Sequence, residues 1–342
     1  MARGGDQARR PTLEDVAAQA GVSRSLVSII MRGAYGASSE TRQRVLQAAR
    51  ELGYRPDARA RLLALTRSRT LGAVFSVQYG FHIELLDGLY AAAERAGYEL
   101  VLSGLTAHRD ERRAMEALLD FRCEAAILLT ETAPHSVLAG RLPVVVVGWQ
   151  VDSEDVDVVR ISDEDGMRQA VEHLSSLGHS IIVHVDGGSG PVAVARRDAY
   201  RAAMRARGLT RHVQVVPGGH TQAEGVSAAE YLLEGGELPT AVVAFNDDVA
   251  AGLAEALARA GVDIPSAMSV IGYDDTSLAR LPFLNLTSVR QDASRLASLA
   301  VERAVARVEG QPVADRQAVI PAELIVRGST TTAPARSDAR RR

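Results

Sequence analysis

The chain of 342 residues is long enough for a small module joined to a larger α/β body, and 46% hydrophobic with only 4% aromatic residues predicts an aliphatic core. The net charge of −3 is uneven, because residues 1–70 hold thirteen Arg against six acidic residues, a balance of +7 that leaves −10 for the remainder. A basic module on an acidic body favours a phosphate-binding head, although a solvated charged face gives the same count. The single cysteine, Cys123, excludes an internal disulfide framework and is expected to be a partly buried, reduced thiol.

Neither a membrane span nor a secretory signal is expected. No stretch reaches the roughly 18 consecutive apolar residues of a spanning helix. The N-terminal segment is charged and no apolar run follows it. The protein is therefore expected in the cytoplasm, associated with the nucleoid.

Two short helices joined by a tight turn are predicted at the start of the basic module. Thr12 can cap the first helix with Asp15 as its capping-box partner, and Gly21 ends that helix. Ser23 can cap the second helix directly after the turn. This helix-turn-helix pattern is typical of DNA-binding proteins. The apolar residues at helical spacing are Leu13, Val16, Ala17, Ala20, Val27, Ile30 and Met31.

A third helix is predicted to complete an all-α head over residues 1–55. Ser38 or Ser39 can cap this helix, and Gly53 followed by Pro56 ends it. Its inward face is expected to hold Val45, Ala49 and Leu52.

The segments TLEDVAAQAGVSRSLVS and SSETRQRVLQAARELGYRPDARARLL resemble the head and hinge of the lactose-repressor (LacI/GalR) family. The resemblance implies that the second helix presents its N-terminal side chains, Arg24 and Ser25, to base edges in the major groove. The guanidinium of Arg24 can pair with guanine O6 and N7. A phosphate contact or a solvated position is the alternative for Arg24.

The resemblance also implies several contacts to DNA phosphates, and the same hydroxyl groups can serve as plain helix caps. Arg32 is a further DNA-binding candidate at a position where the family often has Asn. Leu26 and Ile29 depart from the Thr and Arg that are frequent in the family, which leaves the operator sequence open. The implied phosphate contacts are Thr12, Ser23, Ser28 and Thr41.

Residues 56–70 are predicted to form a hinge helix and linker. The resemblance implies a short helix that orders only on DNA, pairs with its mate in a homodimer and wedges Leu63 into the minor groove, with Arg61 as another DNA contact. So short a helix is marginal alone, and apolar wedges bend DNA by unstacking bases. Leu62 replaces a small polar residue and could strengthen the pairing of the hinge helices. A plain linker is the alternative.

From residue 71 onward, apolar strands alternate with amphipathic helices in two successive sets. The strands of the first set are LGAVFSV, YELVLS, AAILLT and VVVVG, and those of the second are SIIVHV, VQVV, AVVAF and MSVIGY. Helices are expected near 83–96, 109–120, 165–177, 193–207, 221–234 and 247–260. The pattern predicts an α/β sensor of two doubly wound parallel-sheet lobes, with ligands beyond the carboxyl ends of the strands.

The body resembles the periplasmic-binding-protein-like sensor of the same family at ISDEDGMRQAVEHLSSLGHSIIVHVDGG, AVVAFNDDVAAGLAEALARAGVDIP, SVIGYDDT, LTSVRQD and ELIVRGST. With the head, the resemblance covers residues 11–333. It implies three crossings between lobes. The first lobe is then 71–160 plus 290–320, the second is 161–289 plus 321–333, and 334–342 is a disordered tail.

Three polar residues near strand ends match the family's effector-binding positions. Asn246 follows AVVAF, Asp274 follows SVIGY, and Arg196 lies on the helix after DGG. A carboxylate, an amide and a guanidinium can together donate to and accept from sugar hydroxyls. The alternatives are a helix cap for Asn246, a loop or inter-lobe carboxylate for Asp274, and a surface position for Arg196.

An aromatic wall is expected beside these polar groups. Phe81 and His82 match a family aromatic pair at the exit of the first strand, and Trp149 offers a flat face for a sugar ring or else packs at a lobe edge. Gly148 and the pair Tyr79-Gly80 depart from the family pattern. The identity of the ligand therefore cannot be carried over from any relative.

Enzyme functions find little support in the sequence. DGGSGP follows a strand but lacks the G-x-G-x-x-G spacing, and the eight histidines show no metal-ligand spacing, so no cofactor, metal or catalytic residue is expected. The sequence predicts a DNA-binding repressor controlled by a small sugar or sugar-like effector. A transport or chemotaxis binding protein and an enzyme of sugar metabolism are the alternatives. Because no heptad repeat follows RGST, a homodimer on a pseudo-palindromic operator is expected.

Overall fold

The computed structural model describes residues 11–31, 35–54, 67–130, 138, 140–313 and 315–335. The chain divides into two compact units, Met1–Ser68 and Arg69–Arg342, and each is considered by itself. Arg32, Arg61 and Leu63 lie outside the described residues, as do most of the expected hinge and of the expected disordered tail.

The head consists of α1 (Leu13–Ala20), α2 (Arg24–Met31) and α3 (Ser39–Glu51). Thr12 and Asp15 form the predicted capping box, and Gly21 takes the left-handed conformation (φ 64°) that ends α1. Ser23 Oγ accepts from Leu26 N at 3.2 Å. Ser38 rather than Ser39 caps α3. The predicted helix boundaries of the head are thus confirmed.

A small aliphatic core holds the three helices of the head together. The predicted stripes of α1 and α2 meet the inner face of α3, while Leu13, Met31 and Leu52 lie half-buried at the rim. The buried members of this core are Val16, Ala17, Ala20, Val27, Ile30, Val45, Ala48 and Ala49.

The body contains two six-stranded sheets with corresponding strand orders. The first has the order β2-β1-β3-β4-β5-β11 and is parallel throughout. Its strands are β1 (Thr70–Ser76), β2 (Glu99–Leu105), β3 (Ala125–Leu128), β4 (Val144–Val147), β5 (Val156–Ile161) and β11 (Gln317–Ile320).

The second sheet has the order β7-β6-β8-β9-β10-β12. Its strands are β6 (Ile182–Val185), β7 (Gln214–Val216), β8 (Ala241–Ala244), β9 (Ser269–Asp274), β10 (Thr287–Arg290) and β12 (Glu323–Ile325). The edge strand β12 is antiparallel to β10, whereas the other strand pairs of this sheet are parallel, so the predicted parallel-sheet architecture is confirmed with one antiparallel edge. The reason is that β11 runs parallel to β5 and only residues 321 and 322 separate it from β12, so the chain enters the second sheet at the carboxyl edge, where the parallel strands of that sheet end.

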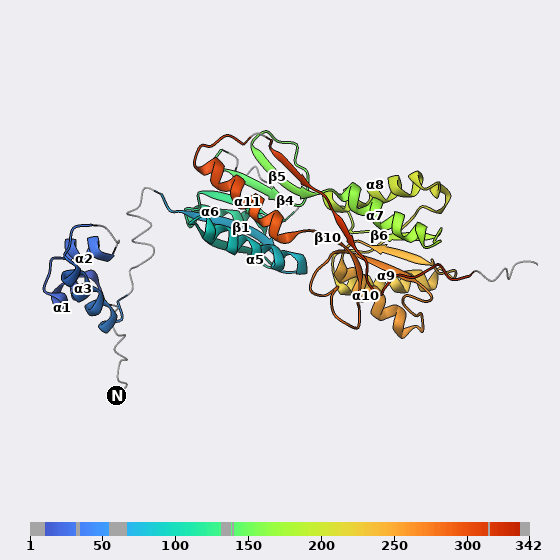
Figure 1. Ribbon diagram of the computed structural model, residues 1–342, viewed down its shortest axis with the longest axis horizontal. Helices are drawn as coiled ribbons and strands as arrows, with labels where there is room; N and C mark the ends of the chain where they lie inside the picture. The colour runs from blue at the N-terminus through green and yellow to red at the C-terminus, as the bar shows by residue number, and fades with distance from the viewer. Residues whose placement is uncertain are drawn as a thin grey trace, which may run out of the picture. The chain divides into compact units, whose positions relative to one another are not determined.

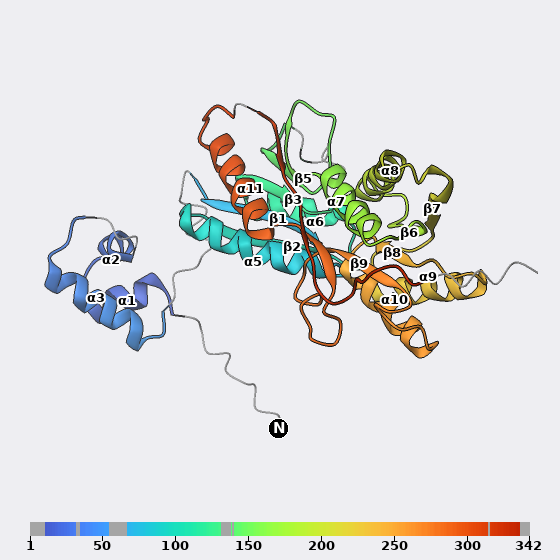
Figure 2. The same ribbon diagram turned by 45° about the vertical axis from the view of Figure 1, so that its right-hand side comes forward.

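Helices cover both faces of each sheet, as the doubly wound architecture predicts (Figures 1 and 2). Helices α5 and α11 pack together on one face of the first sheet, and α6 covers the other. Helices α7 and α8 cover one face of the second sheet, and α9 and α10 the other. The bounds are α5 (Gly80–Arg95), α6 (Glu111–Asp120), α7 (Asp163–Ser176), α8 (Pro191–Ala206), α9 (Gln222–Glu234), α10 (Asp247–Arg259), α11 (Ala293–Val308) and the 3₁₀ turn η2 (Thr210–His212).

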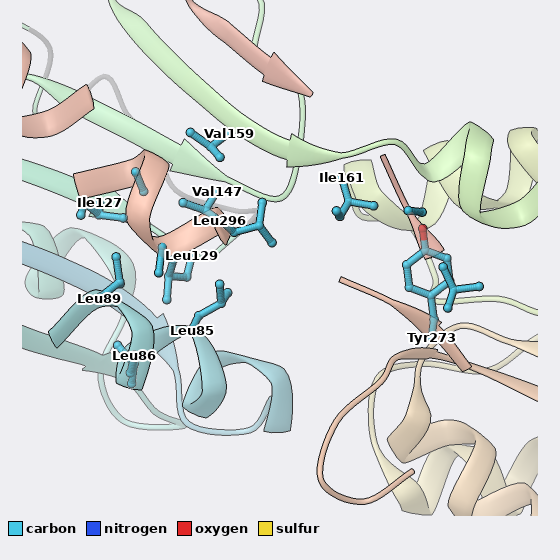
Figure 3. Close-up of a cluster of buried hydrophobic side chains, with 14 of the residues drawn as sticks. Leu85, Leu86, Leu89, Ile127, Leu129, Val147, Val159, Ile161, Tyr273 and Leu296 are labelled. Atoms are coloured by element: carbon cyan, nitrogen blue, oxygen red, sulfur yellow. The ribbon is translucent and has the colours of Figure 1, made fainter. Parts of the chain in front are cut away.

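Alternation along the strands divides the core into two layers. In β3, Ala125 and Ile127 belong to the cluster with α5 and α11, whereas Ala126 and Leu128 belong to the cluster with α6. Figure 3 shows leucines of α5 and α11 directed toward valines and Ile127 of the first sheet. The thiol of Cys123 is buried with the α6 cluster, and burial raises its pKa to about 12.

The chain crosses between the two sheets three times. The crossings lie between β5 and α7, between β10 and α11, and between β11 and β12. Ser162 and Asp292, at the first two crossings, accept hydrogen bonds from backbone N–H groups in the first turns of α7 and α11. The crossing backbone is therefore fixed by helix caps.

Candidate functional site

A cavity of about 80 Å³ lies between the two lobes, with walls from both. It lies at the carboxyl ends of the strands, close to β1 and β3 in the first sheet and to β6 and β8 in the second. In each sheet these strands are where the strand order reverses, which is where ligands bind in open α/β sheets. The cavity brings together the six residues predicted to bind an effector, Phe81, His82, Trp149, Arg196, Asn246 and Asp274.

Arg196 of α8 is buried, with only 3% of its surface exposed. The alternative of a surface position for Arg196 is therefore wrong. Its Nε donates to Asp163 Oδ1 at 3.0 Å, and its Nη1 donates to the carbonyl oxygen of Phe245 at 2.6 Å. The guanidinium carbon lies 3.6 Å from the ring centroid of Tyr273. Burial disfavours the charged form, but Asp163, Tyr273 and Asp274 hold the pKa of Arg196 above its ordinary value.

Asp274 ends β9 with an unusual backbone conformation, φ 103°, and is buried. Its Oδ1 accepts a hydrogen bond from Gln291 Nε2 at 2.7 Å and lies 3.5 Å from Arg196 Nη2. Burial raises the pKa of Asp274 to about 7, although Arg196 and Gln291 oppose this shift. The structure thus presents a strained, partly neutralised carboxyl group at the cavity wall.

The buried carboxylate of Asp247 fixes the loop that follows Asp274. It accepts from Ser288 Oγ at 2.6 Å and from the backbone N of Thr276 at 2.7 Å. Burial, and then the charge of Asp274, raises the pKa of Asp247 well above its ordinary value. This network holds the end of β9 against β10 behind the cavity.

Asn246 caps α10, which was one of the two roles considered for it. Its Oδ1 accepts from Val249 N at 2.8 Å, and its Nδ2 donates to the carbonyl oxygen of His220 at 2.9 Å. The side chain therefore joins α10 to the loop before α9. Asn246 also lines the cavity with its remaining hydrogen-bonding capacity.

Phe81 and His82 lie in the first turn of α5, because this helix begins three residues earlier than its apolar pattern indicates. Ser76 N donates to His82 Nδ1 at 3.2 Å. Burial lowers the pKa of His82 to about 4, so its ring is neutral near pH 7. Trp149 is buried and packs with the α6 cluster while also lining the cavity, so both roles considered for it are compatible with its position.

In the head, Arg24 and Ser25 are exposed in the first turn of α2. Arg24 Nε lies 2.9 Å from Glu14 Oε1 of α1, and 67% of the Arg24 side chain is exposed. Ser38 Oγ donates to Thr41 Oγ1 at 2.9 Å. Thr12 and Ser23 cap helices, and Ser28 is half-buried.

Two family descriptions match the chain. Residues 12–57 match "Bacterial regulatory proteins, lacI family", and residues 171–330 match "Periplasmic binding protein-like domain". The transcriptional regulator AscG of Escherichia coli is 32% identical over 87% of this chain and 92% of its own length. The chain belongs to the lacI family of bacterial regulatory proteins.

Solved structures agree with this membership. A LacI transcriptional regulator from a Rhodococcus species is 41% identical, covers 78% of this chain and all of its own, and has a TM-score of 0.75. The lac repressor dimer bound to operator and the anti-inducer ONPF is 27% identical over 94% of this chain, with a TM-score of 0.82 and its whole chain covered. This lacI-family chain is accordingly a transcriptional regulator with a DNA-binding head and a periplasmic-binding-protein-like body.

Three aromatic residues that line the cavity, Tyr79, His220 and Phe245, were not among the predicted site residues. The rings of Tyr79 and His220 stack at 4.7 Å between centroids and 21° between planes, and His220 meets Phe245 edge-on at 4.6 Å. Burial lowers the pKa of His220. Phe245 directly follows β8, so its position after a strand end could have identified it, whereas His220 lies in the loop between β7 and α9, where no strand-end pattern marks it.

Within the described ranges, no group of three or more His, Cys, Asp or Glu side chains is arranged to hold a metal ion. Over the same residues, no helix has the length and apolar character needed to cross a bilayer.

Proposed function

We propose that this lacI-family regulator represses transcription as a homodimer on operator DNA, and that a small hydroxylated molecule in the inter-lobe cavity changes its operator affinity. The observation that carries the proposal is the cavity itself. It joins a buried carboxylate, an amide and a guanidinium from the second lobe to aromatic and aliphatic walls from the first. The lac repressor dimer with operator and anti-inducer supports the analogy.

The chemistry of the cavity favours a neutral sugar or polyol. Asp274 and Asn246 supply oxygen acceptors, and Asn246 and Gln291 supply amide donors, which suit hydroxyl groups. Phe81 and Trp149 offer apolar faces for a sugar ring. Arg196 is already neutralised by Asp163, so the positive charge that a multiply phosphorylated ligand needs is lacking among the described lining residues.

Control of DNA binding follows if the ligand prefers one arrangement of the lobes, since equal affinity for both would shift nothing. Contacts between the two lobes would change with this arrangement. Ser277 N of the second lobe donates to Glu84 Oε1 of α5 at 2.7 Å, and Arg280 lies 3.4 Å from the same oxygen. In the usual sense of induction, the lobe shift weakens pairing of the hinge helices and lowers operator affinity.

For DNA recognition, we propose base reading by Arg24 and Ser25, and a minor-groove wedge by Leu63. Exposure of the first turn of α2 supports the first assignment. The proposed contacts to the DNA backbone come from Thr12, Ser23, Ser28, Arg32, Thr41 and Arg61.

Exposed apolar side chains on both lobes support the dimer. Ile83 on α5 is 66% exposed and Phe283, between β9 and β10, is 80% exposed, with Leu281 partly exposed in the same segment. The hydrogen bond from Ser277 N to Glu84 Oε1 joins this segment to α5. Exposed apolar side chains favour burial at an interface, and an isologous dimer would bury them on both subunits.

A gel-shift titration tests the proposed function. The full-length protein is titrated onto the upstream region of its own gene, with and without members of a sugar panel. Specific binding that one sugar weakens or strengthens is expected. Absence of specific DNA binding would favour the alternative of a sugar-binding protein without DNA function.

The variant Asp274→Asn tests whether Asp274 binds the effector. Asn suits this position better than Ala, because the left-handed backbone tolerates Asn. The variant is expected to bind operator like the wild type and to need at least tenfold more sugar for its response, since an amide N–H replaces an acceptor. Asp198→Asn, on the exposed side of α8, is the matched control and should respond normally. A normal response by Asp274→Asn would contradict the assignment.

A further inference from the structure

A second, larger chamber adjoins the effector cavity on the far side of the Tyr79–His220 stack. Its volume is about 660 Å³, against about 80 Å³ for the inner cavity. Tyr79 and His220 line both spaces, so the stacked pair is the partition between them. Tyr79 comes from the first lobe and His220 from the second, so a relative shift of the lobes would separate the rings.

The outer chamber also has polar side chains on its walls. The first lobe contributes Ser76, Gln78, Thr106 and Thr130. Thr130 is decisive, because only 3% of it is exposed and its buried Oγ1 has no hydrogen-bond partner among the described residues. An unpartnered buried hydroxyl is costly, and a ligand hydroxyl in the chamber can relieve that cost after rotation of the threonine side chain.

The opposite wall is glycine-rich backbone. Gly188 has φ 95° and nothing within 4 Å of the place where a Cβ would stand, so a ligand can approach its backbone closely. Gly190 caps α8 without any side-chain acceptor, and Pro191 follows it. Because Gly190 has no side chain, it cannot accept hydrogen bonds from the first-turn N–H groups of α8. These N–H groups can therefore donate to oxygen atoms of a ligand.

The charges around the chamber favour a neutral occupant. Glu224 accepts hydrogen bonds from His220 N at 2.8 Å and from Thr221 N at 2.9 Å, so it serves the N-terminus of α9. Arg197, near Gly188, is paired with Asp186. Among the described lining residues, no unpaired cation remains to select a phosphate, whereas hydroxyls and backbone N–H groups suit a second sugar unit.

We propose that the effector spans both chambers: one sugar unit is held in the inner cavity, and a second unit of a disaccharide lies in the outer chamber against Thr130 and the glycine backbone. This proposal rests on the proposed function, because it takes the inner cavity as the effector site. The Tyr79–His220 partition opens when the lobes move to admit the linkage. The outer chamber then distinguishes a disaccharide from a monosaccharide, because only a disaccharide can fill it.

Isothermal titration calorimetry on the full-length protein tests whether a second sugar unit of the ligand contributes to affinity. Glucose is compared with cellobiose and maltose, and galactose with lactose. One disaccharide is expected to bind at least tenfold more tightly than its constituent monosaccharide. Ala107→Trp and Ser189→Trp, which fill the chamber from opposite walls, should abolish this advantage without changing the monosaccharide affinity. Ala202→Trp, on the exposed part of α8, is the matched control and should keep the advantage.

Thr130→Val provides a second test with effects of opposite sign. Removal of an unpartnered buried hydroxyl should raise the melting temperature of the free protein, whereas the affinity for the disaccharide should fall severalfold. Equal affinity for both members of every pair, absence of binding by every sugar, or an advantage that survives both tryptophan variants would overturn the proposal. Gel shift with operator is run on the same samples, so retained DNA binding distinguishes failure of this proposal from failure of the proposed function.

Discussion

Arg196 is held in place by the protein before any ligand is bound. Asp163 and the carbonyl of Phe245 fix two of its nitrogens, and Tyr273 supports its flat face. A guanidinium fixed in this way loses little conformational entropy when it meets a ligand. At the residue scale, the site is therefore preorganised around Arg196, and Asp274 is the group whose state can change near neutral pH.

The raised pKa of Asp274 predicts a pH-dependent stability difference from Asp274→Asn. A carboxyl with pKa near 7 in the folded state and 3.8 when unfolded keeps its proton longer in the folded protein, so its stabilising contribution is full below about pH 4 and is lost as the pH rises to 7. Wild-type stability relative to the variant should fall over this window by at most about 1.4 kcal/mol per pH unit. Urea unfolding from pH 4.5 to 8 measures it.

The variant is compared directly with the wild type because other groups titrate in the same range. His82 and His184, both with pKa values lowered to about 4 by burial, lose stabilising contributions as the pH falls from 6.5 to 4, the opposite trend. They are present in both proteins and cancel in the difference. Parallel pH profiles would show that Asp274 is charged throughout.

Arg24 is expected to determine base preference. Arg24→Ala should weaken binding to the best operator by about 1–3 kcal/mol and relax preference at one position in each half-site. Binding to a library of operator variants measures this. Glu14→Gln removes only the partner that Arg24 has in the structure and should leave the preference unchanged. Uniform weakening across all sequences would make Arg24 a phosphate contact.

At the scale of elements, glycine decides how closely α9 and α10 approach. A Cβ on Gly225 would lie 2.2 Å from the carbonyl oxygen of Val249, and one on Gly252 would lie 1.9 Å from that of Gln222. Since these contacts are with backbone, no side-chain rotation can relieve them. The two helices pack through their glycines, against the usual preference for other residues within helices.

Gly252→Ala is therefore expected to destabilise the body, although alanine favours helix by about 1 kcal/mol over glycine. The overlap with Gln222 should outweigh this and leave a net loss of about 1–3 kcal/mol in the free energy of unfolding. Urea unfolding measures it. Glu255→Ala, at an exposed position of the same helix, should change stability by less than about 0.5 kcal/mol. A more stable Gly252→Ala protein would disprove the close-packing argument.

At the scale of the whole body, two sheets of the same strand order face each other across one cavity and share three chain crossings. Because the crossings lie between β5 and α7, β10 and α11, and β11 and β12, each lobe is built from separate stretches of the chain. A ligand held by both lobes can thus change the position of each lobe as a unit.

The exposed side chains of Ile83 and Phe283 predict how the dimer can be broken. Phe283→Glu combined with Ile83→Glu should give monomers at micromolar concentration, because charges would be buried at the interface. Sedimentation velocity measures the molecular mass. Tyr231→Glu changes a comparably exposed aromatic residue on α9 and should leave the dimer intact. A wild-type protein that is monomeric at these concentrations would refute the dimer.

Local sequence patterns were sufficient to predict most elements of the fold. Thr12, Ser23 and Asn246 marked helix starts, and the apolar runs from LGAVFSV to MSVIGY predicted β1 to β4 and β6 to β9. The strands β5, β10, β11 and β12 and the helix α11 were not predicted individually. β11 and β12 lie at sheet edges with half-exposed residues and carry little of the apolar periodicity that marks a buried strand.

The sequence by itself determined the head, the doubly wound class and, through the motifs that resemble the lacI family, the six candidate residues that meet in the inner cavity, because strand ends, helix caps and family motifs are encoded within a few neighbouring residues. Only the tertiary structure decided the antiparallel direction of β12, the internal pairing of Arg196 with Asp163, and the stack of Tyr79 on His220. Each of these depends on residues far apart in the chain, and in the stack they come from different lobes. Their contacts follow from how the two sheets are joined, which no local pattern of residues specifies.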